Sequence, residues 1–155
     1  MENHVYAYTT VLTGEDLLIK TDVDVFFGSK LDLHNAKRKT YQALWDTGAC
    51  WTSLSKAYIK ELGLEKKRSA RAYTANGIVD VDTYIANIML SGNILMQEVE
   101  ILELVSDCGS SMLIGMDIIR LLDFSLTVNE NGERVLSYGI PHTKMIDFTE
   151  DLLKE

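Results

Sequence analysis

Apolar and polar residues alternate along short stretches of this chain, and this alternation limits its fold more than any other feature. In residues 17–27 every second position is Leu, Ile, Thr, Val or Phe, whereas Lys20, Asp22 and Asp24 lie between them. Successive side chains of a strand point to opposite faces, so this stretch is expected to be a strand with one buried face. Further strands are expected at residues 5–11, 40–45, 70–75, 78–90, 94–105, 124–128 and 133–138. Many short strands and few helices predict an all-β sandwich or barrel.

Turn signals separate these expected strands. Asn76-Gly77 lies between two of them and is the strongest hairpin signal in the chain. A second hairpin is expected around residues 129–132, and residues 28–39 are expected to form a loop. The apolar run at residues 112–114 is too short for a helix.

Few stretches have the properties of helices. Residues 55–62 are expected to form a short helix, with Ser55 as its N-cap and Gly63 just beyond its end. Residues 116–122 are long enough for two helical turns, and residues 148–154 for a short terminal helix.

Composition and charge narrow the functional classes. The 155 residues are 46% hydrophobic and 25% charged, which predicts one globular domain spanning residues 1–155. The net charge of −8 argues against binding to nucleic acid or to an anionic membrane. The sequence shows no signal peptide and no apolar stretch long enough to span a bilayer, and its two cysteines form no disulfide framework. A cytoplasmic protein with reduced thiols is therefore expected.

The charge is unevenly distributed along the chain. Residues 1–77 carry a net charge of +2, and residues 78–155 carry −10. The basic residues gather at positions 37–39 and 66–68, with Arg71 nearby. Such runs are expected to be solvated loops, with a docking patch for an acidic partner as the alternative.

Asp46-Thr47-Gly48-Ala49 is the stretch most informative about chemistry. Alone it is a weak signal, because Asp, Thr and Gly all favour a local turn at the end of a strand. Here it follows the apolar stretch at residues 43–45, so the carboxylate is expected to emerge where a buried strand ends.

Three ordered segments together resemble the retropepsin-like aspartic proteases, single-lobe enzymes related to the retroviral proteases and to half of a pepsin. Residues 43–49 resemble the catalytic loop and the strand leading into it, and residues 74–77 look like the flap turn of bacterial members. Residues 113–119, which begin Leu-Ile-Gly, resemble the family's second apolar-apolar-Gly segment and the helix after it. The resemblance covers residues 40–128 and implies a closed, mostly β single-lobe barrel with one or two short helices, acting as a homodimer.

The resemblance also implies a chemistry and a set of site residues. Aspartic proteases need two neighbouring carboxylates that share one proton, one acting as general base on water and the other as acid toward the scissile carbonyl. The chain has a single Asp-Thr-Gly, so the second carboxylate is expected from another copy in a two-fold dimer. The expected catalytic residues are Asp46, Thr47 and Gly48, and the expected substrate-binding residues are Ala49, Ala75, Asn76, Gly77, Ile114 and Gly115.

Within these expected roles, the Thr47 hydroxyl would bond across the two-fold axis and Gly48 would offer an N–H to the carboxylate. Residues 1–39 are expected to be an N-terminal extension of the protease core, and residues 129–155 a C-terminal hairpin and tail. In retroviral members the termini form the dimer sheet, so the extra segments here could rebuild that interface, cover the cleft or dock elsewhere.

The predicted function is aspartic endopeptidase, acting on peptide or protein substrates without cofactor or metal and with no nucleic-acid or membrane partner. One alternative is a catalytically silent dimerisation or peptide-binding module on the same fold. Another is a cysteine peptidase using Cys50, although a buried apolar role suits a free cysteine better.

Asp117 is expected to be structural at a helix start. Trp45 is expected in the core, and Trp51 either in the core or in a substrate subsite.

Overall fold

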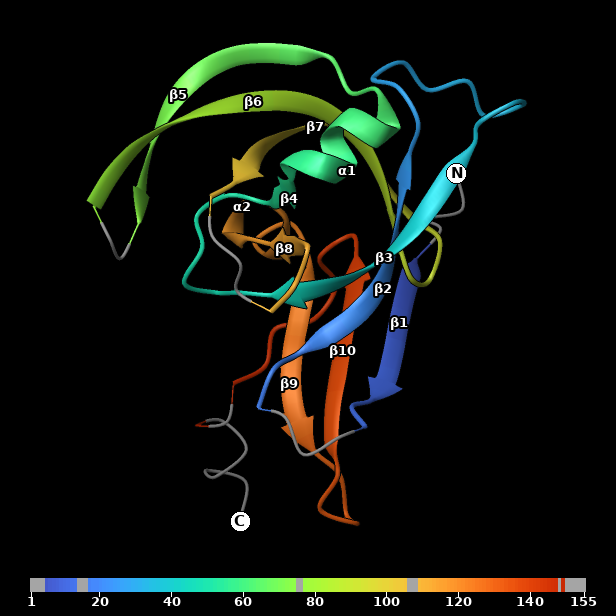
Figure 1. Cartoon of the computed structure of the whole chain (residues 1–155). Coiled ribbons are helices and arrows are strands. Elements are labelled where there is room, and N and C mark those ends of the chain that lie inside the picture. The colour runs from blue at the N-terminus through green and yellow to red at the C-terminus, as the bar shows by residue number, and fades with distance from the viewer. Residues whose placement is uncertain (1–4, 14–16, 75–76, 106–108, 148, 150–155) are drawn as a thin grey trace.

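The computed structural model describes residues 5–13, 17–74, 77–105, 109–147 and 149 (Figure 1). It is built almost entirely of strands, with two short helices. The elements are β1 (Tyr6–Val11), β2 (Lys20–Phe26), β3 (Arg38–Trp45), β4 (Ser53–Ser55), α1 (Lys56–Leu62), β5 (Lys66–Thr74), β6 (Gly77–Leu90), β7 (Ile94–Leu104), β8 (Met112–Ile114), α2 (Met116–Ile119), β9 (Asp123–Val128) and β10 (Arg134–Ile140). The expected all-β class with short helices is confirmed.

Six strands close into a barrel. Their order is β2-β3-β8-β4-β7-β6, and β6 returns to pair with β2, which closes the ring. β5 pairs with the first half of β6 and extends the sheet outside the ring. In Figure 1, β5 and β6 run together as a long curved ribbon that reaches beyond the barrel.

The alternating pattern of residues 17–27 is confirmed only in its middle. Val23 and Val25 are 1% and 0% exposed and point into the barrel. The strand nevertheless begins at Lys20, because its ladder with β3 runs from Lys20 to Phe26. Leu17 precedes this ladder and is 90% exposed, so the expectation that it shares the buried face is wrong.

The first and last described strands, β1 and β10, lie in a second, three-stranded sheet. Its order is β1-β10-β9, with antiparallel registers that pair Tyr8 with Tyr138 and Tyr138 with Phe124. The sheet packs on the barrel through aromatic rings: Trp45 lies 4.9 Å from Tyr138 and 5.4 Å from Phe124, centroid to centroid. Trp45, which is 4% exposed, is therefore a core residue as expected, and it links the barrel to this sheet.

The basic clusters are held by ion pairs within the chain. Residues 66–68 belong to β5, so the expectation that they form a solvated loop is wrong. Lys67 and Arg68 both bond to Glu100, at 2.7 and 2.8 Å, and the hydrogen bond from Lys67 lowers the pKa of Glu100. In the other cluster, Arg38 and Lys39 begin β3, so the loop expected over residues 28–39 ends before them. Lys39 bonds to Glu61 at 2.6 Å.

Two helix expectations are adjusted by the structure. Gly63 ends α1 in the left-handed conformation, with φ of 64°, as expected, but the Ser55 side chain makes no capping bond. α2 has four residues rather than two turns, because β9 begins at Asp123. Residues 148 and 150–154 of the expected terminal helix lie outside the described residues. Within the described part of the chain, neither helix is long and apolar enough to cross a membrane.

Candidate active site

Asp46 lies where strand β3 leaves the barrel. Trp45 pairs in parallel with Ile114 of β8, and the N–H of Asp46 donates to the carbonyl of Ile114 at 2.9 Å. The carboxylate therefore emerges from a buried strand end, as the sequence predicted, and Asp46 itself is half-buried. The second apolar-apolar-Gly segment supplies the neighbouring strand, so it lies directly beside this loop.

The loop at residues 46–49, the proposed catalytic loop, turns back onto the Asp46 carboxylate. The N–H of Gly48 donates to Oδ1 of Asp46 at 2.8 Å, and the N–H of Ala49 donates to the Asp46 carbonyl at 3.1 Å. A Cβ at Gly48 would lie 3.1 Å from the same Oδ1, so a larger residue would crowd the approach. Thr47 and Gly48 are exposed in the single chain.

Backbone hydrogen bonds join the proposed catalytic loop to the start of α2. The N–H of Met116 donates to the carbonyl of Ala49 at 2.8 Å, and that of Asp117 donates to the carbonyl of Cys50 at 3.2 Å. Gly115 packs against the same stretch, where a Cβ would come within 2.6 Å of a backbone carbon of Trp51. The structure thus brings together the predicted residues of both segments.

Thr52 joins the segment after the proposed catalytic loop to the start of α2, a contact that the sequence interpretation missed. It is fully buried, and its N–H and hydroxyl both donate to Oδ1 of Asp117 at 2.9 Å. The hydroxyl also accepts the N–H of Gly115 at 3.2 Å. The structural role expected for Asp117 is supported, but its partner is this threonine. A threonine three positions after the loop, followed by Ser-Leu-Ser of β4, was the available signal.

The β5–β6 hairpin is confirmed up to its last described pair. Its ladder runs to Thr74 opposite Gly77, and the Thr74 hydroxyl donates to the Gly77 carbonyl at 2.9 Å. Gly77 has φ of 115°, a conformation that L-residues with a side chain rarely adopt. The other predicted flap residues, Ala75 and Asn76, lie outside the described residues.

Among the described residues, neither His34 nor His142 is bonded to Cys50. Cys50 is exposed rather than buried, which corrects the expectation of an apolar filler. His142 bonds through its ring to Asp123, and His34 lies in a loop where its backbone bonds to Asp32. No group of three metal-ligating side chains occurs among the described residues.

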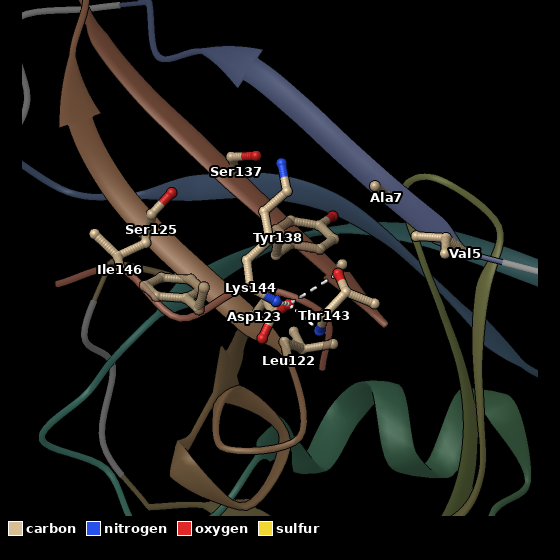
Figure 2. A pocket seen from close by; sticks show the side chains of 12 residues that line it. Val5, Ala7, Leu122, Asp123, Ser125, Ser137, Tyr138, Thr143, Lys144 and Ile146 are labelled. Carbon is tan, nitrogen blue, oxygen red and sulfur yellow. Dashed lines mark hydrogen bonds between the residues drawn. The ribbon is translucent and has the colours of Figure 1, made fainter. Parts of the chain in front are cut away.

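A cavity of about 470 Å³ lies away from the proposed catalytic loop (Figure 2). It opens between the outer face of the β1-β10-β9 sheet and residues 143–146. Ala7, Ser137 and Ser125 come from the three neighbouring strands and form its floor. None of the predicted site residues lines it, so cavity size alone does not identify the candidate active site.

Asp123 lines this cavity and binds the segment at residues 142–144. Its carboxylate accepts the N–H groups of Thr143 and Lys144 at 2.7 and 3.0 Å, and it lies 2.9 Å from Nδ1 of His142. The backbone bond from Thr143, followed by the bond from His142, lowers the pKa of Asp123 to about 2. Because the folded-state pKa is depressed, this attachment is fully present above the ordinary pKa and is lost as the pH falls toward 2.

Release of this segment is therefore expected only in acid. In the wild type, amide exchange at Thr143 and Lys144, corrected for intrinsic exchange, should accelerate between about pH 4 and about pH 2. Asp123→Asn should show faster exchange at both amides already at neutral pH. The exposed carboxylate of Asp80 provides a control, and Asp80→Asn should leave both amides protected. Unchanged protection in Asp123→Asn would contradict this attachment.

The barrel with its strand-end aspartate defines a class of protein: a single-lobe, retropepsin-like fold. A retropepsin-like aspartic protease from Rickettsia conorii superposes with a TM-score of 0.53 at 15% identity, covering 88% of this chain and 93% of that one. EIAV protease complexed with the inhibitor HBY-793 gives a TM-score of 0.50 at 18% identity, covering 71% and 92%.

Sequence comparison defines the family. The family described as "gag-polyprotein putative aspartyl protease" matches residues 34–121, more than half of the chain. The chain belongs to this aspartyl protease family. No curated protein sequence matches it. The expected retropepsin-like relationship is confirmed, and residues 46–49 and 113–119 both lie inside the matched stretch.

Proposed function

We propose that this protein is an aspartic endopeptidase in which two Asp46 carboxylates, one from each copy of a homodimer, activate a water molecule. The observation that carries the proposal is the geometry at Asp46. Its carboxylate sits at a barrel-strand end and accepts the N–H of Gly48 at 2.8 Å, in a loop left exposed on the single chain. Membership of an aspartyl protease family and the retropepsin-like fold support the same conclusion.

The proposed reaction needs no group beyond these carboxylates, water and the peptide. One carboxylate takes a proton from water while the water oxygen bonds to the scissile carbonyl carbon. The other carboxyl group gives its proton to the carbonyl oxygen, which forms a neutral tetrahedral diol. The C–N bond then breaks: the nitrogen takes up the proton that the first carboxylate received from water, and a diol hydroxyl gives its proton to the second carboxylate. The products are a carboxylic acid and an amine.

The dimer follows from the single catalytic aspartate. One chain supplies one Asp-Thr-Gly, and two carboxylates must lie close enough to share a proton. Exposure of Thr47 and Gly48 on the single chain leaves this loop free to meet its symmetry mate. In the proposed dimer the Thr47 hydroxyl braces the partner loop.

Substrate is proposed to lie between this loop and the β5–β6 hairpin. Ala49, Ile114 and Gly115 form the floor near Asp46, and Ala75, Asn76 and Gly77 form the flap tip. A flap of this kind excludes water and holds an extended peptide through main-chain hydrogen bonds. Residues 1–39 and 129–155 are proposed to belong to the same functional unit, because β1 pairs with β10.

The test is cleavage of a mixed peptide library between pH 3 and pH 8, read by mass spectrometry. Cleavage by the wild type that disappears in Asp46→Asn supports the proposal and gives the side-chain preference. Equal cleavage by both proteins would show that Asp46 is not catalytic. Binding of peptides without cleavage by either protein would instead favour a silent peptide-binding module.

Gly77→Pro tests the flap. Proline fixes φ near −65°, whereas Gly77 has φ of 115°, so the substitution should distort the hairpin end. We expect kcat/KM to fall about tenfold or more, with little change in Tm, because Gly77 is exposed and outside the core. Gly132→Pro makes the same kind of change in the β9–β10 connection, where φ is 78°, and should leave kcat/KM near that of the wild type. Equal losses in both variants would remove the flap assignment.

A further inference from the structure

Trp51 is a large aromatic residue that the core does not use. It is 44% exposed, in contrast to Trp45. Its backbone is nevertheless tightly held, because Gly115 packs against its carbonyl group and Asp117 binds the N–H of the next residue, Thr52. A rigid segment adjoining the proposed catalytic loop therefore presents an apolar ring to solvent.

A groove of about 320 Å³ lies beside this ring. Its other apolar walls come from β7, through Met96 and Val99, and from α2 and the turn after it, through Ile118 and Leu121. Leu121 is 48% exposed, so two large apolar side chains face solvent at one groove. A concave site lined mainly by apolar side chains suits the binding of an apolar group.

The charged groups at this groove are already engaged within the chain. Asp117 accepts two hydrogen bonds from Thr52, and Glu100 is bonded to Lys67 and Arg68. The groove therefore offers mainly apolar contact, and its chemistry suits an uncharged, bulky side chain rather than a cation.

The helix that borders the groove, α2, also adjoins the candidate active site. Met116 is 36% exposed, and its N–H bonds to Ala49 of the proposed catalytic loop. Met116 begins α2, the helix that carries Ile118 and precedes Leu121. A peptide that extends from Asp46 past Ala49 would therefore run toward the helix that borders the groove.

We propose that this Trp51 groove, formed by Trp51, Met96, Val99, Ile118 and Leu121, binds one bulky apolar side chain of the peptide substrate, outside the residues that contact Asp46. The inference rests on the proposed function and makes Trp51 a specificity-determining residue. In a two-fold dimer the groove occurs twice, once on each side of the two-fold axis. Substrates carrying a bulky apolar residue at some distance from the scissile bond, on either side, are therefore preferred.

The activity test uses twelve-residue peptides built on the best-cleaved library sequence. Each position at some distance from the scissile bond, called an outer position, carries Phe or Ser in turn. For the wild type, Phe should raise kcat/KM about tenfold over Ser at one outer position or more. In Trp51→Ala and Leu121→Ser this Phe/Ser ratio should fall to about one. Leu33→Ser removes an exposed leucine from another loop, 64% exposed, and should keep the wild-type ratio. A wild-type ratio of one at every position, or an unchanged ratio in Trp51→Ala, would overturn the proposal.

Binding to the inactive Asp46→Asn protein separates this inference from the proposed function. The Kd of the Phe and Ser peptides should differ by a similar factor, and the additional Trp51→Ala change should erase the difference. If the wild type cleaves nothing, the peptides are built instead on the library sequence that binds Asp46→Asn most tightly, and a difference in Kd that Trp51→Ala erases means that hydrolysis fails and the groove stands. If cleavage occurs but Phe and Ser peptides bind equally, the groove fails and hydrolysis stands. Loss of the dimer in Trp51→Ala, measured by sedimentation, would identify the occupant as a second copy and would also overturn the inference.

Discussion

Asparagine at position 46 is expected to lower kcat/KM for a cleaved peptide by about a thousandfold or more, because an amide accepts no proton from water. The substitution preserves shape. In the wild type, the Gly48 nitrogen lies 2.8 Å from Oδ1 of Asp46, and an asparagine Oδ1 can accept the same N–H. The backbone N–H of residue 46 still donates to the carbonyl of Ile114. Tm should therefore stay close to that of the wild type while activity is lost. Steady-state kinetics and thermal unfolding of the same preparation measure both quantities.

A matched control and a mixing experiment make this prediction specific. Asp32→Asn changes an aspartate whose bonds, among the described residues, all go to His34 and Asn35 of its own loop, and it should keep wild-type activity. Wild-type chains mixed with an excess of Asp46→Asn chains should lose more activity than dilution explains, because most of them then pair with an inactive partner. Activity proportional to the wild-type concentration, whatever the amount of mutant, would contradict a site shared between two chains.

The features predicted correctly from the sequence are those encoded by neighbouring residues. Alternation around Val23 and Val25 indicates a half-buried strand, and Asn-Gly between two strands indicates a hairpin. The bond from Gly48 to Asp46 is equally local, since it spans two positions of one loop. In each case the information lies within a few residues, where backbone geometry and side-chain chemistry act directly.

The features missed are those that depend on distant partners. β4 and β8 have three residues each, too few for a periodic pattern, and they exist because Ser53 and Leu54 pair with Leu113 and Met112. β8 also pairs in parallel with β3, which lies far away in the sequence. No local signal specifies such pairings, since they depend on how the whole barrel closes.

The coupling of Thr52 to Asp117 is another long-range feature. Sequence alone could favour a structural role for Asp117, but its partner lies 65 positions away. The same holds for the pairing of β1 with β10. The candidate active site is therefore specified partly by a short motif and partly by tertiary contacts that hold this motif against α2.

Alanine at position 115 is expected to be the most damaging small substitution near the site. The backbone of Gly115 is extended, with φ of −95° and ψ of −177°, so any residue could adopt it without strain. The cost is steric: a Cβ would lie 2.6 Å from a carbonyl carbon of Trp51 and 2.9 Å from the nitrogen of Thr52, and neither backbone atom can rotate away. Separating these segments would also stretch the bond from Gly115 to Thr52.

Gly115→Ala should therefore reduce the free energy of unfolding by about 3 kcal/mol, and kcat/KM should fall even where the protein remains folded. Urea unfolding measures the first effect, and peptide cleavage at a temperature well below Tm measures the second. Gly132→Ala is the matched control: its Cβ meets no atom within 4 Å, and only its φ of 78° opposes the substitution. That variant should lose about 1 kcal/mol with little loss of activity. A smaller loss of stability at position 115 than at position 132 would show that the two segments are not in tight contact, and that α2 does not fix the proposed catalytic loop.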